Sequence, residues 1–144
     1  MNFGLGLSQL KLFLSVLVIM AVIDYIWIGV IYSNQYRKVI ENVQKEKFVV
    51  KILGGVIVYF ALAIIIVGWI IPRIKVELKN SSYSNLFISS LLYGGILGGL
   101  IYAVFDFTNY AIFDKWDFKT SIIDSVWGMV LFTITTFLTL LINK

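Results

Sequence analysis

Residues 102–128 of this 144-residue chain read YAVFDFTNYAIFDKWDFKTSIIDSVWG. Two apolar stretches meet here across a short polar hairpin at residues 114–119. The first stretch carries Asp106 and the second carries Asp124. A carboxylate inside a membrane-spanning segment is costly and usually marks a functional site. The stretch therefore predicts two antiparallel membrane helices, joined by the hairpin, that bring polar groups into the interior of a bundle.

The composition indicates a membrane protein. Hydrophobic residues make up 60% of the chain and charged residues 14%, whereas charged residues make up about 25% of a soluble domain. The apolar residues fall in long blocks, and a helix of about 20 residues crosses a hydrocarbon core of roughly 30 Å. We therefore predict an all-α fold, an integral membrane bundle of four transmembrane helices in a single domain over residues 1–144. The predicted spans are residues 7–32, 50–71, 85–113 and 121–142.

The composition also excludes several kinds of site. The chain has no cysteine and no histidine, so disulfides, thiolate chemistry and histidine-ligated metals are excluded. Any metal would need oxygen ligands, and no cofactor is evident. The net charge of +4 lies mainly in the loops, which favours contact with membrane lipids over nucleic acid. We expect a multi-pass protein of a bacterial cell membrane, or of a viral or host membrane.

The connections between the spans carry weaker signals. Residues 33–49 are basic and amphipathic, and both an interfacial helix and a solvated charged loop fit this pattern. Pro72 predicts the end of the second span, and residues 73–84 predict a polar loop. The interior of the second span has no charged group, so we expect it to be structural support, with Tyr59 as a packing or interfacial residue.

The third span has the most informative helical pattern. Small and polar residues recur at every fourth position and so follow one face of a helix. They are Ser90, Gly94, Gly98, Tyr102, Asp106 and Tyr110, and Gly95 and Gly99 widen the small-residue strip. Small residues spaced in this way let helix backbones approach closely in lipid, so the strip should face another helix. Along the same face the packing surface is followed by a polar site.

Topology places three carboxylates at similar depth in the membrane. Asp24 and Asp106 lie near the ends of the first and third spans, and Asp124 lies near the start of the fourth. These three helix ends face the same side, so each carboxylate should lie roughly 5–12 Å inside one interface. Gathered there, the three acids cannot all be ionised at low cost. We expect either that a proton is retained or that a cation is held between them.

The candidate ligand or ion site consists of acidic, aromatic and small polar residues. They are Asp24, Trp27, Tyr102, Asp106, Thr108, Asn109, Asp124 and Trp127. We expect Tyr102, Thr108 and Asn109 to form one polar cluster with Asp106 near a helix end.

Structural roles compete with a site role for two of the acids. The spacing Ser121-x-x-Asp124 fits a capping box at the start of the fourth helix, where a negative charge also suits the helix dipole. Asp24 and Asp124 could each accept a hydrogen bond from an indole, crosswise from Trp127 and Trp27. Such bonds would join helices without any ligand.

In these residues the chain resembles a known family, the domain of unknown function 2177, which comprises small four-helix membrane proteins of bacteria and some large DNA viruses. The resemblance covers most of the chain. It depends on Asp24-x-x-Trp27-x-Gly29, Tyr36-Arg37, Tyr102-x-x-x-Asp106-x-Thr108-Asn109-x-Ala111, Trp116 and Asp124-x-x-Trp127-Gly128, in this order. Phe105 departs from the pattern, which usually has tyrosine before the aspartate. The resemblance implies the four-span topology and the same polar residues, and it implies no established activity.

Three classes of function remain open. The leading hypothesis is a membrane protein whose carboxylate cluster binds or moves a proton, a cation or a small polar group. The second is a lipid-modifying enzyme with an aspartate as general acid or base. The third is a structural or assembly subunit of a membrane complex, or a homo-oligomer, with the glycine strip as its contact surface.

Overall fold

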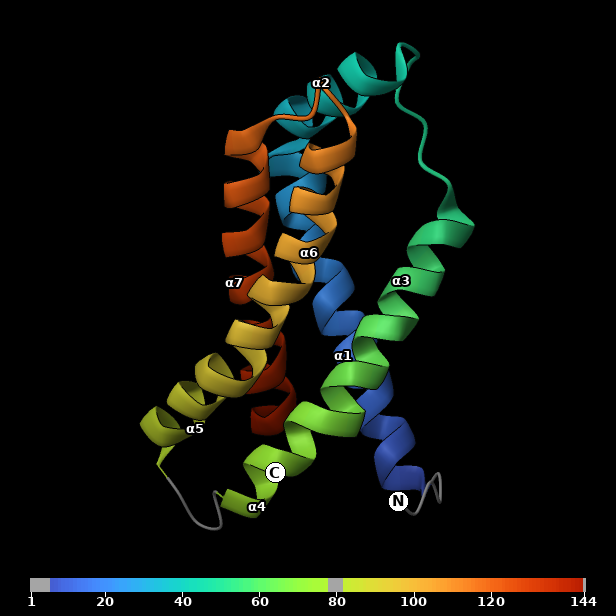
Figure 1. Cartoon of the computed structure of the whole chain (residues 1–144). Helices are drawn as coiled ribbons and strands as arrows, with labels where there is room; N and C mark the ends of the chain where they lie inside the picture. Colours follow the sequence, from blue (N-terminus) through green and yellow to red (C-terminus); the bar gives the residue numbers. More distant parts are fainter. Residues whose placement is uncertain (1–5, 78–81, 144) are drawn as a thin grey trace.

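The protein folds into four long helical rods. The computed structural model describes residues 6–77 and 82–143, and every regular element within these ranges is a helix. Four rods are long and apolar enough to cross a membrane, and they cover Leu7–Ile31, Ile52–Glu77, Tyr83–Ile112 and Phe118–Ile142 (Figure 1). The predicted all-α membrane fold with four spans is confirmed.

Three of the rods contain a π-helical segment. The first rod consists of α1 (Leu7–Ile26) and η1 (Trp27–Ile31), and the second of α3 (Ile52–Ile65), η2 (Ile66–Ile70) and α4 (Ile71–Glu77). The third rod consists of α5 (Tyr83–Ser89), η3 (Ser90–Gly95) and α6 (Ile96–Ile112). The fourth rod is the single helix α7 (Phe118–Ile142). A π turn accommodates one extra residue and often occurs near a functional site.

The predicted end of the second span at Pro72 is wrong, because the helix continues to Glu77. A proline inside an α-helix lacks an N–H group and clashes with the carbonyl four residues earlier. Here the wide turn of η2 comes directly before the proline, and the Ile71 N–H donates to the carbonyl of Ile66, five residues back. The wider turn makes room for the proline ring. The remainder of the predicted polar loop includes residues 78–81, which lie outside the described residues.

A short helix covers one end of the bundle. This helix, α2 (Ser33–Gln44), follows η1 and ends at Lys45, whose φ of 59° is left-handed. It lies across the end at which α6 and α7 are joined (Figure 1). Of the two structures that fit residues 33–49, the helix is therefore the one present in the first part of this segment.

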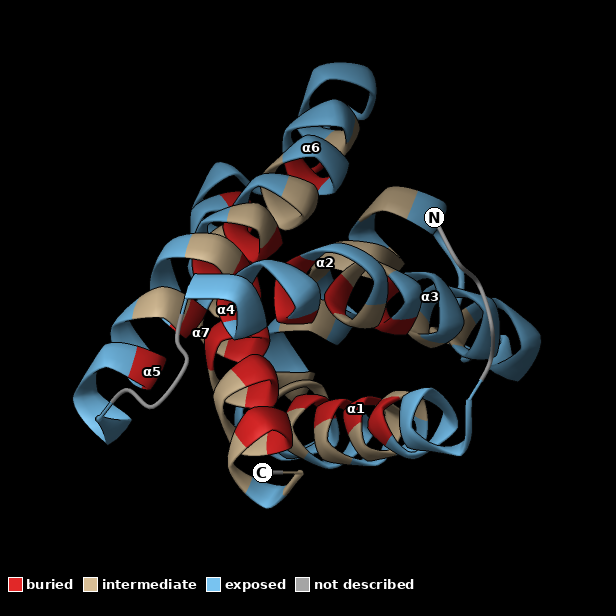
Figure 2. Ribbon diagram, turned by 90° about the horizontal axis from the view of Figure 1, so that it is seen from below, coloured by how far each residue is buried: buried red, intermediate tan, exposed pale blue. Residues whose placement is uncertain are grey.

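The central helix of the bundle is α7. Both α1 and α6 pack on it, while α3 packs on α1. Leu131 and Phe132 of α7 join Val16 and Met20 of α1 in one hydrophobic core. Buried residues lie on the inward sides of the helices and exposed residues on the outward sides (Figure 2). The outward sides carry many large apolar residues, which suits contact with lipid.

The small-residue strip of the third span lies against α7. A Cβ atom added at Gly98 would meet the backbone carbonyl of Gly128 and would lie 2.6 Å from Cβ of Phe132. One added at Gly128 would lie 2.7 Å from the carbonyl oxygen of Gly98. Ser90 and Gly94 are also buried on this side. The backbones of α6 and α7 are therefore in direct contact, which only glycine allows.

This contact predicts that Gly98→Ala destabilises the protein by about 1–3 kcal/mol, because the added methyl group has to push α6 away from α7. The free energy of unfolding in detergent micelles, followed by circular dichroism, measures the effect. Gly54→Ala is the matched control, since no described atom lies within 4 Å of the position its Cβ would take. Equal unfolding free energies for the two variants would contradict the close contact.

Candidate functional site

The three intramembrane carboxylates lie near the end of the bundle that α2 covers. Asp24 precedes Ile31, the end of the first rod, by seven residues, and Asp106 precedes Ile112 by six. Asp124 follows Phe118, the start of α7, by six residues. At 1.5 Å per residue each lies about 10 Å from its helix end. All three are buried.

Asp24 is held by two hydrogen bonds from two other helices. The Tyr59 hydroxyl of α3 donates to Asp24 Oδ2 at 2.7 Å, and the Trp127 indole N–H of α7 donates to Asp24 Oδ1 at 2.8 Å. Hydrogen bonds to a carboxylate are among the stronger ones in proteins. Asp24 therefore joins α1, α3 and α7 at the level of the site.

Only half of the predicted crosswise pairing is present. Trp127 does bond to Asp24, but the Trp27 indole N–H has no hydrogen-bond partner in the described part of the chain. Instead the Trp27 ring is stacked between Trp127, with ring centroids 4.5 Å apart, and Tyr32, at 5.3 Å. Stacking buries both faces of the ring, and the expected bond from Trp27 to Asp124 is not made.

Asp106 and Asp124 form a pair of carboxyl groups whose surroundings differ from those of Asp24. Their carboxyl groups are in direct interaction range, and Asp124 also lies within electrostatic range of Asp24. Asp106 is 0% exposed and Asp124 is 4% exposed. By distance and angle, both oxygens of Asp106 and Oδ1 of Asp124 are buried without a hydrogen-bond partner among residues 6–77 and 82–143. The indole of Trp116 donates to the Ser121 hydroxyl and also lies within interaction range of Asp106. In native proteins, buried polar atoms of this kind are satisfied by a proton, a water molecule or a ligand.

The capping role considered for Asp124 is wrong. The N-cap of α7 is Asp117, whose Oδ2 accepts hydrogen bonds from the Thr120 N–H at 2.7 Å and the Thr120 hydroxyl at 2.8 Å. The helix begins three residues earlier than predicted, because Asp117 provides a better placed carboxylate. Asp124 is therefore inside the helix and is free for another role.

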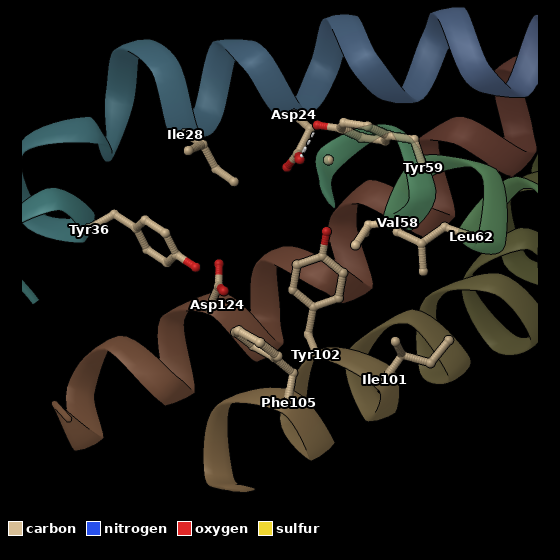
Figure 3. A pocket seen from close by; sticks show the side chains of 11 residues that line it. Asp24, Ile28, Tyr36, Val58, Tyr59, Leu62, Ile101, Tyr102, Phe105 and Asp124 are labelled. Atoms are coloured by element: carbon tan, nitrogen blue, oxygen red, sulfur yellow. Dashed lines mark hydrogen bonds between the residues drawn. The ribbon is translucent and has the colours of Figure 1, made fainter. Parts of the chain in front are cut away.

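A cavity of about 380 Å³ lies beside these acids (Figure 3). Five helices contribute to its wall, and the lining residues are Asp24, Ile28, Tyr36, Gly55, Val58, Tyr59, Leu62, Ile101, Tyr102, Phe105 and Asp124. Cavities that bind small molecules usually measure about 300–1,000 Å³. The cavity is therefore large enough for an organic ligand, and two of the three acids face it.

Tyr36 reaches into the cavity from α2, outside the membrane-spanning segments, and its hydroxyl points toward Asp124 (Figure 3). Burial, followed by the nearby carboxyls of Asp124, Asp106 and Asp24, raises the pKa of the Tyr36 hydroxyl above its ordinary value. The hydroxyl therefore keeps its proton at neutral pH and is available as a donor to an occupant of the cavity.

Five of the eight predicted site residues are not part of the cavity lining, namely Trp27, Asp106, Thr108, Asn109 and Trp127. Tyr102 lines it, but Thr108 is exposed on the outer side of α6 beside Val104, and half-buried Asn109 is not part of the lining. Residues that are two positions apart in a helix are separated by about 200° around its axis. Thr108 and Asp106 have this spacing, so their side chains point in nearly opposite directions. The expected polar cluster of Thr108 with Asp106 is not formed.

Sequence reasoning missed Tyr59, which was expected to be a packing or interfacial residue. Tyr59 follows Ile52, the start of α3, by seven residues, which is about 10 Å along the helix. This depth matches that of the three acids, since the second span begins on the side where the first ends. Applying the depth comparison to hydroxyl groups as well as carboxylates would have found it.

The bond to Asp24 predicts that Tyr59→Phe lowers the free energy of unfolding by about 1–3 kcal/mol, because one buried carboxylate oxygen loses its donor. Tyr25→Phe is the control, since Tyr25 lies on the same helix as Asp24 and is 70% exposed. Denaturant titrations of both variants in detergent provide the comparison. An effect of the same size in both would mean that the Tyr59 hydroxyl does not support Asp24.

Comparison with known proteins agrees with the resemblance drawn from the motifs. A family model described as "Predicted membrane protein (DUF2177)" matches residues 9–141, which is nearly the whole chain. The chain belongs to this family. No match was found among curated proteins or among solved structures.

Proposed function

We propose that this member of the DUF2177 family binds a proton and a cation alternately at the Asp106–Asp124 carboxyl pair. The observation that supports this proposal is the set of three buried carboxyl oxygens without a donor in the described chain. Asp124 lines the cavity, whereas Asp106 is not part of the lining and is in contact with the cavity only through Asp124. The pair is thus in contact with the space from which a ligand would come.

The electrostatics of the pair require a positive occupant. A carboxylate inside an apolar bundle has lost its water, which costs several kcal/mol. Two such charges about 4 Å apart would also repel each other by about 4 kcal/mol at an effective dielectric constant of 20. A single proton shared by the two carboxyls removes the repulsion and creates an O–H···O hydrogen bond. A cation placed against Asp124 removes the same repulsion without the proton, so the two occupants compete.

Asp24 has a separate role in this proposal. Its oxygens already accept bonds from Tyr59 and Trp127, so it is fixed in place with its carboxyl group in the cavity wall. The exchange of occupants then takes place at Asp106–Asp124, while Asp24 favours positive over neutral ligands.

Exchange of the occupant takes place on one side of the bundle. Beyond the cavity the interior is filled by Val16, Met20, Ile66, Leu131 and Phe132, each fully buried. These side chains leave the site accessible from the end covered by α2 and from the cavity. A proton released from the pair would leave toward that end, past the hydroxyl of Tyr36.

Infrared spectroscopy of the purified protein at neutral pH tests the shared proton. We expect an absorption band of a protonated carboxyl group, and we expect Asp106→Asn and Asp124→Asn each to remove it, because either change breaks the pair. Asp114→Asn is the control, since Asp114 lies exposed in the hairpin between α6 and α7.

Circular dichroism of each variant establishes that the bundle is still helical. If the band is absent from the natural protein, or if it persists in both pair variants, the pair holds no proton and the proposed exchange is overturned.

A further inference from the structure

The cavity that contacts the carboxyl pair opens toward the lipid. Val58 of α3 and Phe105 of α6 line it, yet they are 53% and 52% exposed. Both residues lie within membrane-spanning rods, so the medium on their outer side is acyl chain. Figure 1 shows α3 tilted away from α6 on the side of α2, while α3 packs on α1 and α6 on α7. A molecule dissolved in the bilayer can therefore reach Asp124 between α3 and α6.

The two parts of the cavity wall have different chemistry. Toward the lipid the wall is apolar, with the exposed side chains of Val58 and Phe105, and the buried Leu62 and half-buried Ile101 continue this apolar lining further in. At the inner end Asp24 and Asp124 face the space, together with the hydroxyls of Tyr36 and Tyr102 (Figure 3). This distribution fits a molecule that has an apolar body and one positive group.

Other classes of ligand fit the cavity less well. An anion would meet two carboxylates and no lysine or arginine in the described lining. A bare metal ion would need several acidic ligands, and residues 6–77 and 82–143 contain no group of three or more that could hold one. A metal ion would also fill little of the cavity, because its volume of about 380 Å³ far exceeds the roughly 30 Å³ that a single water molecule occupies. A neutral apolar molecule would offer no polar partner to the carboxyl group of Asp124, which lines the cavity.

From this arrangement we infer that the cation is an amphiphilic organic cation, such as a lipophilic amine or quaternary onium ion, and that it enters from the bilayer between α3 and α6. The inference rests on the proposed exchange at Asp106–Asp124 and specifies its ligand. The positive group lies against Asp124, where the aromatic rings of Tyr36, Tyr102 and Phe105 add cation–π attraction. The apolar body lies against Val58 and Leu62, and the proton of the carboxyl pair is released to water at the end covered by α2.

Binding of tetraphenylphosphonium to the purified protein tests this inference. Isothermal titration calorimetry should show binding of the cation, with release of a proton to a weakly buffered solution. Tetraphenylborate has nearly the same shape and the opposite charge, and it should not bind. Asp124→Asn should weaken the binding of tetraphenylphosphonium at least tenfold, and Asp114→Asn should leave it unchanged.

Two neighbouring glycines on α3 provide a test that leaves the carboxyl groups intact. No described atom lies within 4 Å of an added Cβ at Gly54 or at Gly55, but only Gly55 lines the cavity. Gly55→Leu should fill the space and weaken the binding of tetraphenylphosphonium, while Gly54→Leu should have no effect. Because both side chains enter open space, both variants should fold.

The outcomes separate the ligand from the shared proton. Equal binding of tetraphenylborate, or equal affinities of the two glycine variants, overturns the organic-cation site. If the carboxyl band is present and specific to the pair but tetraphenylphosphonium does not bind, the inference fails while the proton site stands. If the cation binds in a manner that depends on Asp124 and Gly55 but no carboxyl band exists, the ligand assignment stands and the shared proton is wrong.

Discussion

The backbones of α6 and α7 touch at Gly98 and Gly128, and the placement of the acidic groups depends on this contact. A Cβ atom at either glycine would run into the carbonyl of the other. Asp106 lies eight residues beyond Gly98, and Asp124 lies four residues before Gly128. Because the helices are antiparallel, both acids lie toward the same end of the contact. Helix packing and charge placement are therefore one structural feature, and a bulkier residue at the contact would disturb both.

The buried carboxyl groups of the bundle have two different hydrogen-bonding environments. Asp24 receives a neutral donor at each oxygen, one from α3 and one from α7. Of the four oxygens of Asp106 and Asp124, three are fully buried and accept no hydrogen bond from the described chain. The first arrangement binds helices together and provides one donor to each oxygen of the acid. The second leaves unsatisfied acceptors next to a cavity. An acid that joins helices and a pair of acids with unpaired oxygens thus lie at the same level of the bundle, distinguished by their hydrogen bonds.

Sequence reasoning predicted the depth of the site and failed on rotation about the helix axes. The direction of each span and the rise per residue were sufficient to bring Asp24, Asp106 and Asp124 to one level. The direction in which a side chain points depends on tertiary packing, so the outward position of Thr108 was missed. Helix ends were also poorly predicted. The role of Asp117 as N-cap moved the start of α7, and the π turn before Pro72 allowed the second span to continue.

The stack of Trp27 on Trp127 gives the protein an optical reporter of its own interior. The two indoles lie 4.5 Å apart and nearly parallel, and the N–H of Trp127 is bonded to Asp24 in the cavity wall. Indole fluorescence responds to stacking, hydrogen bonding and local charge, so the emission of this pair follows the electrostatic state of the cavity. Of the other two tryptophans, Trp69 is exposed on the outer side of its helix, and Trp116 lies in the hairpin and donates to the Ser121 hydroxyl. Replacing those two by phenylalanine isolates the signal of the stack.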